Sequence, residues 1–250
     1  MNYMMKKDLL DMTFLIPVRV DSIIRIENLL ASIHNIQRSF KTHIMILEAD
    51  SNCNGVLKKI LPKNVEYIYV KDNDPIFYRT HFLNIMTQKT KTDFLAIWDA
   101  DIIIPARQIY ESIQLLRTKK CDVVYPYDGK FADVTTVLRE LYIEIQDVRL
   151  FTNNESKMIY PYGFEMLGGA IFVNRQKYIS AGMENEKFYG WGPEDGERYH
   201  RWINHGYKIE RVKGKLFHLT HPRNINGRYN SDLQKKNLDV AFFQTLGKWY

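Results

Sequence analysis

Two acidic residues of this sequence have a spacing that could support metal chemistry. Asp99 and Asp101 stand in "WDAD" directly after an apolar run, and alternate residues of an extended segment point the same way. Two carboxylates that face one site repel each other unless a cation lies between them, and hard divalent ions take oxygen ligands. A strand that ends in a turn with surface acids explains the same tripeptide, so the motif does not establish a metal site alone.

His218 and His221 form an HxxH pair in "FHLTHPRN". On a straight strand, residues three apart point to opposite faces, so both imidazoles reach one ion only if the backbone turns near Thr220. Pro222 keeps His221 out of helical conformation, which favours such a turn. Imidazole and carboxylate together suit Mn²⁺ or another first-row ion better than Ca²⁺, with Mg²⁺ as a second choice. A structural or solvent-facing role for each histidine is the alternative.

The stretch "FYGWGPEDGERYHRW", residues 188–202, places Glu194 and Asp195 side by side. A helix that begins at Pro193 explains part of it, because acids are favourable in the first turn and opposite charges four residues apart attract. The expected pairs are Glu194–Arg198 and Glu197–Arg201, and the expected buried face is Tyr199, Trp202 and Ile203.

The helix does not explain "YGWG", residues 189–192. Glycine lets backbone approach a ligand closely, and aromatic faces beside carboxylates commonly hold sugars by stacking and by hydrogen bonds to hydroxyls. Trp191 and Gly192, followed by the two acids, therefore predict a sugar-binding site.

Short apolar runs alternate with amphipathic segments over the first half of the chain. This β-α alternation predicts an α/β fold with a mostly parallel central sheet flanked by helices. Ligands of such sheets bind beyond the carboxyl ends of the strands, where Arg19, Glu48 and the aspartates of "WDAD" stand. We expect strands at 13–18, 43–50, 65–70, 93–101 and 122–127, and helices at 22–37, 77–89 and 105–118.

The second half is less regular. We expect helices at 134–150 and 194–204, a strand at 168–173, and a helix over the last twenty residues. No repeat, low-complexity tract or linker rich in Pro, Gly or Ser interrupts the sequence, so residues 1–250 are expected to form a single domain.

The segments "WDAD", "LGGAIFVNRQKY", "YGWGPEDGERYHRWINHGYKI" and "HLTHPRN", in this order, resemble the β-1,4-galactosyltransferase group and related bacterial enzymes that build chondroitin-like and other surface polysaccharides. "FLIPVR" and "FYRTHFLN" resemble that family's donor-binding segments. The resemblance runs from about residue 13 to residue 224. It implies a GT-A fold with a nucleotide-sugar-binding half at 13–130, an acceptor- and metal-binding half at 160–224, and a C-terminal helical tail at 228–250.

The resemblance also implies a metal-dependent, inverting transfer of a hexose, either galactose or N-acetylgalactosamine, from a UDP-sugar to a hydroxyl of a glycan. Asp195 matches the catalytic base, with Glu194 beside it. His218 stands where the animal enzymes have a methionine ligand, and Gly196 replaces another acid. The implied metal ligands are Asp101, His218 and His221; the expected nucleotide-sugar-binding residues are Arg19, Glu48, Arg79, Asp99, Asp101, Met166 and Gly169; and the acceptor-binding residues are Trp191, Gly192, Glu194 and Asp195.

Composition restricts the partners and the location. The net charge is +6 and the pI about 9.1, but the basic residues are scattered and no nucleic-acid-binding motif occurs, so nucleic acid is not an expected partner. No apolar run approaches the roughly 20 residues that span a bilayer, and the N-terminus lacks a signal-peptide pattern. With Cys53 and Cys121 as free thiols, we expect a cytoplasmic protein. The C-terminal "LGKWY" and nearby lysines would allow peripheral contact with an anionic membrane that carries a lipid-linked acceptor.

Two other functions use similar residues. A nucleotidyltransferase or phosphohydrolase also places acids and a metal at strand ends, but a nucleotidyltransferase normally has a Gly-rich phosphate loop, and "IPVRVDSIIR" contains no glycine. A non-catalytic carbohydrate-binding protein of the same fold is the other alternative. The presence of Asp101, His221 and Asp195 together argues against it.

Overall fold

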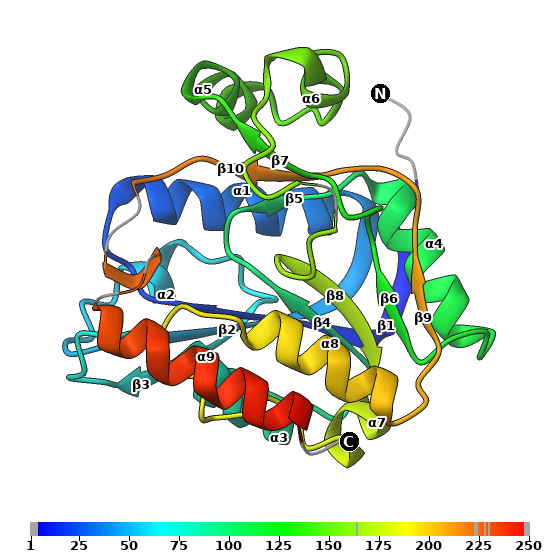
Figure 1. Cartoon of the computed structure of the whole chain (residues 1–250). Coiled ribbons are helices and arrows are strands. Elements are labelled where there is room, and N and C mark those ends of the chain that lie inside the picture. Colours follow the sequence, from blue (N-terminus) through cyan, green and yellow to red (C-terminus); the bar gives the residue numbers. More distant parts are fainter. Residues whose placement is uncertain (1–4, 164, 223–224, 228, 230, 248–250) are drawn as a thin grey trace.

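A seven-stranded sheet forms the centre of the protein (Figure 1). We describe a computed structural model, which covers residues 5–163, 165–222, 225–227, 229 and 231–247; the end of "LGKWY", residues 248–250, lies outside this range. The strand order is β3-β2-β1-β4-β8-β6-β9. The strands are β1 Lys7–Val18, β2 Phe40–Asp50, β3 Glu66–Lys71, β4 Phe94–Trp98, β6 Val123–Tyr125, β8 Ala170–Asn174 and β9 Ile209–Arg211.

The sheet is mostly parallel, as the alternation of strands and helices predicts. β1 runs parallel to β2 and β4, and β3 and β9 run parallel to their neighbours β2 and β6. β8 is antiparallel to both β4 and β6. The second half of β1, from Met12 to Val18, is buried and apart from Thr13 apolar, because a strand covered on both faces must be largely apolar on both faces. The α/β class with a central sheet flanked by helices is confirmed.

A second, three-stranded sheet was not expected from the sequence. It has the order β5-β10-β7, with β5 Ile102–Ile103, β7 Phe131–Val134 and β10 Leu216–Leu219. Its strands are two to four residues long, which is too short for a period of two to be recognised in a sequence. They come from three distant parts of the chain, and β10 lies between the other two.

The helices expected from the sequence are present except in one region, and two short helices, Val56–Ile60 and Arg175–Ser180, were not expected. Ser22 caps α1 as expected, since its hydroxyl accepts a hydrogen bond from the Arg25 amide. The segment 134–150 is not one helix, because Thr135 caps a helix that ends where Gln146 takes φ +56°. The helices are α1 Ile23–Ser39, α2 Val56–Ile60, α3 Arg79–Lys89, α4 Ala106–Arg117, α5 Thr136–Ile145, α6 Arg149–Thr152, α7 Arg175–Ser180, α8 Glu194–Asn204 and α9 Asp232–Gly247, with short 3₁₀ turns at Glu155–Lys157 and Ile225–Gly227.

Two helices matter most for the cavity described below. α8 follows the "YGWG" segment, and α9, the red helix of Figure 1, packs alongside it. α5 and α6 lie apart from them, above the small sheet. Within the described residues, no helix combines the length and apolar character that a membrane span requires.

Candidate active site

One cavity of about 490 Å³ lies beyond the carboxyl ends of β1 and β4, where a sheet of this kind binds ligands. Glu48 does not line it: its side chain is buried on β2 and accepts a hydrogen bond from the Tyr67 hydroxyl at 2.5 Å. The expected residues that do line it are Arg19, Arg79, Asp99, Asp101, Met166, Gly169, Trp191, Gly192, Glu194, Asp195, His218 and His221.

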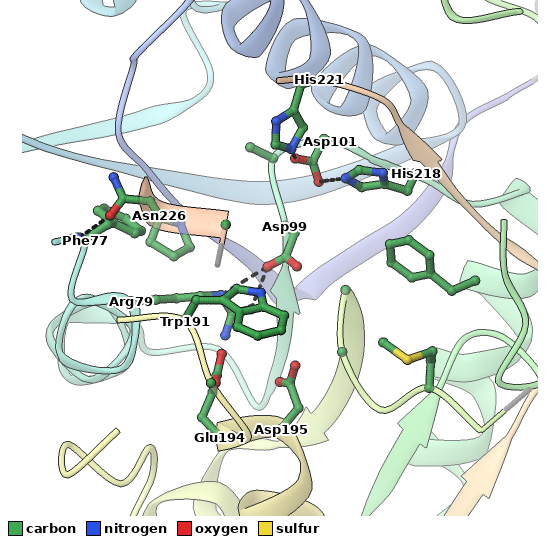
Figure 2. Close-up of a pocket in the computed structure, with 18 of the residues that line it drawn as sticks. Phe77, Arg79, Asp99, Asp101, Trp191, Glu194, Asp195, His218, His221 and Asn226 are labelled. Carbon is green, nitrogen blue, oxygen red and sulfur yellow. Dashed lines mark hydrogen bonds and ion pairs between the residues drawn. The ribbon is translucent and has the colours of Figure 1, made fainter. Parts of the chain in front are cut away.

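The small sheet assembles a cluster of three possible metal ligands at one end of this cavity (Figure 2). Asp101 directly precedes β5, which pairs with β10, and β10 carries His218. β10 ends at Leu219, so the chain is free to turn and bring His221 to the same place. Nε2 of His221 lies 3.0 Å from Asp101 Oδ2, and Nε2 of His218 lies 3.7 Å from Asp101 Oδ1. The turn that the HxxH spacing requires is therefore present.

Both imidazoles are held with the nitrogen that faces Asp101 available for a ligand. Nδ1 of His218 lies 2.8 Å from Asp133 Oδ1, and β7 carries Asp133 in register with His218. Nδ1 of His221 lies 2.9 Å from the Pro222 carbonyl. Metal-binding histidines typically donate their other N–H in this way, which fixes the ring and its tautomer. One carboxylate and two Nε2 atoms, all within 4.8 Å of one another, fit a first-row divalent ion.

The charges of the cluster favour an ionised carboxylate. Burial alone would raise the pKa of Asp101, but His218 and His221 lower it well below its usual range. Burial alone would lower the pKa of His218, but Asp101 and Asp133 raise it to about 9. Without a metal, a proton on His218 therefore supplies the positive charge that Asp101 requires. A cation that binds there replaces this proton.

Asp99 and Asp101 have different partners although both line the cavity. The sequence predicts a strand over 93–101, but β4 ends at Trp98 and the two acids lie in the turn to β5. Asp99 Oδ1 accepts hydrogen bonds from Arg79 Nη2 at 2.6 Å and Nε at 3.1 Å. Burial and the neighbouring Asp101 raise the pKa of Asp99, against the effect of Arg79. Nη1 of Arg79 is buried and has no hydrogen-bond partner among the described residues, so it can still bind a ligand.

Sequence reasoning missed Arg25, which lies on the first turn of α1. Its guanidinium lies 3.7 Å from Asp101 Oδ2 and donates to Asp21 at 2.9 Å, and it lines the cavity. A cation beside the possible metal ligands suits an anionic ligand. The sequence gives no sign of this, because an arginine in an amphipathic helix is ordinary.

Arg19 also lines the cavity, but its guanidinium N–H groups donate hydrogen bonds to other residues of the protein. It bonds to Asp72 at 2.6 Å and to the Ala49 and Asp74 carbonyls. It therefore shapes the wall beside Phe77.

The first turn of α8 forms the opposite wall of the cavity. Figure 2 shows Trp191 across the middle, with Asp99 on one side and Glu194 and Asp195 on the other. Trp191 is 38% exposed, and its ring meets that of Tyr229 edge to face at 4.9 Å. Part of the indole is therefore accessible where it lines the cavity, which stacking on a sugar would require.

Two features of the expected helix are wrong. Arg198 does not pair with Glu194; it pairs with Asp195 and with Glu184. Ile203 is 47% exposed rather than buried, because only the side of α8 near Trp202 faces the core. The expected Glu197–Arg201 pair is present at 2.8 Å.

The glycines of this segment also allow close packing within the protein, although Gly192 and Gly196 line the cavity as well. A Cβ on Gly192 would lie 2.8 Å from Leu238 of α9, and one on Gly196 would lie 3.3 Å from Phe242. A Cβ on Gly190 would meet Ile76 and Gln234 at 2.8 Å. These glycines therefore let α9 pack against the segment that carries Trp191, which sequence reasoning did not anticipate.

Glu194 should make stability depend on pH. Burial and the neighbouring Asp195 raise its pKa to about 8, whereas an unfolded glutamate titrates near pH 4.3. Between these values the folded state binds more protons, so the free energy of unfolding falls as pH rises. Relative to Glu194→Gln, the wild type should lose at least about 1.4 kcal/mol, the equivalent of one pKa unit, between about pH 5 and pH 9. Urea unfolding of both proteins measures this, and identical pH dependence would refute it.

Residues 149–224 match a family model described as the N-terminal domain of galactosyltransferase. This match includes α8 and the two histidines of the possible metal cluster, His218 and His221. Comparison with curated proteins found no match.

Solved structures similar to this chain are glycosyltransferases. The catalytic domain of Drosophila β1,4-galactosyltransferase 7, in complex with xylobiose, is 16% identical to this chain with a TM-score of 0.54. The alignment covers 92% of this chain and 78% of that one. A Pyrobaculum calidifontis mannosyltransferase with GDP-Man and Mn²⁺ is 13% identical, with a TM-score of 0.58 and coverage of 95% and 64%. The chain has the GT-A fold.

A third similar structure is glucosyl-3-phosphoglycerate synthase of Mycobacterium tuberculosis, in complex with Mn²⁺, UDP and phosphoglyceric acid. It is 11% identical with a TM-score of 0.52, and the alignment covers 84% of this chain and 71% of that one. At these identities, the similarity establishes the GT-A fold.

Proposed function

We propose that this protein is a metal-dependent, inverting glycosyltransferase that moves a hexose from a UDP-sugar to a hydroxyl of a glycan. The observation that carries the proposal is one cavity with two different ends. The cluster of Asp101, His218 and His221 lies at one end, and the acids Glu194 and Asp195 lie at the other, with Trp191 between them. The similar galactosyl-, mannosyl- and glucosyltransferase structures support it.

The first end would bind the donor. A divalent ion, Mn²⁺ in our proposal, would be held by Asp101, His218 and His221, and it would neutralise charge on the diphosphate leaving group. Arg25, and Arg79 through its unpaired Nη1, supply positive charge for the same anion. Asp99 orients Arg79 through two hydrogen bonds.

The second end would bind and activate the acceptor. A sugar hydroxyl is a weak nucleophile and requires a base within reach. Asp195 would accept the hydroxyl proton while the hydroxyl oxygen forms a bond to C1 of the donor sugar. The bond from C1 to the phosphate oxygen breaks, and UDP leaves with its electron pair. Attack from the side opposite to UDP inverts the configuration at C1. Glu194 would bind an acceptor hydroxyl, and Trp191 would stack on the sugar.

Acceptor-stimulated release of UDP tests this function. With Mn²⁺ and a UDP-sugar, the wild type should release UDP slowly alone and faster when a suitable glycan is added, and EDTA should abolish release. UDP-sugar binding without stimulation by any member of a broad glycan panel would instead indicate a carbohydrate-binding protein.

The donor sugar should be galactose or N-acetylgalactosamine. Met166 lines the cavity two residues before the first glycine of "GGA", where the resembling family often has an aromatic residue that crowds the C2 substituent. Methionine is narrower and adapts its shape. UDP-GalNAc should therefore compete with UDP-galactose with an affinity within about tenfold, or about 1.4 kcal/mol. Met166→Tyr should weaken UDP-GalNAc selectively. Rejection of UDP-GalNAc by the wild type would exclude this role for Met166.

The acceptor should be a lipid-linked or growing bacterial surface glycan at the cytoplasmic face of a membrane. The protein is basic overall, and binding to an anionic surface strengthens with both charge and apolar contact. Sedimentation with anionic vesicles should therefore occur at low salt and weaken at high salt, and no binding at either salt would contradict this location. The exposed apolar and basic side chains along α9 that support it are Leu233, Lys235, Lys236, Val240 and Phe243.

A further inference from the structure

Asp195 lies between two groups to which the sequence patterns assign no role beside it. On one side, Nη2 of Arg198 donates a hydrogen bond to Asp195 Oδ1. On the other side lies Gly168, where a Cβ would come within 2.4 Å of Asp195 Oδ2. The carboxylate therefore lies between the guanidinium and the Gly168 backbone. Its side chain is still 28% exposed toward the cavity.

Arg198 is itself fixed by a second carboxylate. Its side chain is fully buried, and Nη1 donates to both oxygens of Glu184 at 2.7 and 2.8 Å. Glu184 also accepts from the Tyr178 hydroxyl at 2.7 Å, and its backbone exchanges two hydrogen bonds with Asn84 of α3. The guanidinium is therefore held in a frame that connects α3, α7 and α8.

The charges of Arg198, Glu184 and Asp195 do not cancel. A buried arginine that paired with one aspartate alone would leave the pair without net charge. Here Glu184 already compensates Arg198, so the three groups together keep one negative charge. Glu184 is buried with its side chain 1% exposed, whereas Asp195 faces the cavity. The charge is thus available where a ligand can reach it.

We propose that Arg198, neutralised by Glu184, is a positioning residue that holds Asp195 in the orientation from which it accepts the acceptor proton. This inference rests on the proposed function. Arg198 does not touch the substrate; it acts through the single contact with Asp195, and Gly168 limits the carboxylate from the opposite side. Displacement of a reacting group by about 1 Å can cost about a hundredfold in rate.

Arg201 provides a matched control one turn further along α8. It pairs with Glu197 at 2.8 Å and donates to the Met183 carbonyl at 2.8 Å, so it ties α8 to the same neighbouring segment. Its hydrogen bonds go to Glu197 and to the Ala181 and Met183 carbonyls, and not to Asp195. A purely structural role for Arg198 would give the two arginines similar effects on stability and on activity.

The test compares paired substitutions, because removal of one partner from a buried ion pair is strongly destabilising, whereas replacement of both is tolerated better. Arg198→Met with Glu184→Gln should lower kcat by about tenfold to a hundredfold, while donor KM and the affinity for UDP with Mn²⁺ stay within about twofold. The double variant Arg201→Met with Glu197→Gln should have a melting temperature similar to that of the first double variant, but a kcat close to that of the wild type. Equal kcat values for the two pairs would overturn the proposal.

Gly168→Ala tests the same idea without disturbing the ion pair. The atoms nearest to the new Cβ all belong to Asp195, with Oδ2 at 2.4 Å, so the carboxylate has to move from its position beside Arg198. Stability should change little, while kcat should fall by a similar factor. Wild-type kcat in Gly168→Ala would contradict the confinement of Asp195. If the wild type itself transfers no sugar, the proposed function fails and this inference falls with it; transfer that the variants retain overturns the inference alone.

Discussion

Asp195→Asn should lower the rate of sugar transfer by at least about a hundredfold, because general-base catalysis contributes typically 10²–10⁴-fold. Asparagine keeps the shape of the side chain, and its carbonyl oxygen can still accept the hydrogen bond from Arg198. It cannot take a proton from a hydroxyl. Since the donor end of the cavity is built from other residues, affinity for UDP with Mn²⁺ should be unchanged.

Glu194→Gln is the matched control for this prediction. It removes the neighbouring acid without removing the base, so it should weaken acceptor binding more than it lowers kcat. Steady-state kinetics with varied acceptor, together with calorimetric titration of UDP, separates the two effects. Near wild-type transfer by Asp195→Asn would mean that the acids only begin α8, as the ordinary explanation of "GPEDGE" holds.

His221→Ala should have the second large effect, on metal binding. It removes one of three protein ligands, and loss of a group that only supports a ligand already costs about tenfold to a hundredfold in metal affinity. We therefore expect a loss of at least about a hundredfold in Mn²⁺ affinity measured with UDP present. The asparagine variant of Asp133, which supports His218 at 2.8 Å, should lose about tenfold to a hundredfold.

Comparison of the two variants makes the metal prediction specific. Loss of a metal ligand should cost more affinity than loss of a residue that orients a ligand. His221→Ala should therefore bind Mn²⁺ more weakly than Asp133→Asn does. Equal affinity in wild type and His221→Ala would remove His221 from the site. Equal affinity in wild type and Asp133→Asn would show that the small sheet does not tune the cluster.

Long periodic elements could be predicted from the sequence. The apolar spacing of 22–37 gave α1 nearly to the residue, because the buried face of a long helix repeats several times. Pro193, the acids of the first turn and the i,i+4 charge spacing gave α8. The parallel arrangement of the first strands followed from the same alternation. The small sheet could not be predicted, since strands of two to four residues have too few positions to show a pattern.

Candidate site residues could be found where a motif groups them. "WDAD", HxxH and "GWGPED" all lie on one cavity. The residues that were missed act through partners distant in sequence: Asp133 reaches His218 across 85 positions, and Glu184 reaches Asp195 only through Arg198. The packing of Gly192 and Gly196 against α9 was not foreseen, because α9 begins about forty residues further along the chain.

Anomalous diffraction from manganese, in crystals soaked with Mn²⁺ together with either UDP or UDP-galactose, tests the central claim most directly. The account predicts a manganese peak between Asp101, His218 and His221, with diphosphate oxygens beside it and the sugar end of the donor directed toward Trp191 and Asp195. A manganese peak or a nucleotide bound outside this cavity, or an ion there without contact to either histidine, would contradict it.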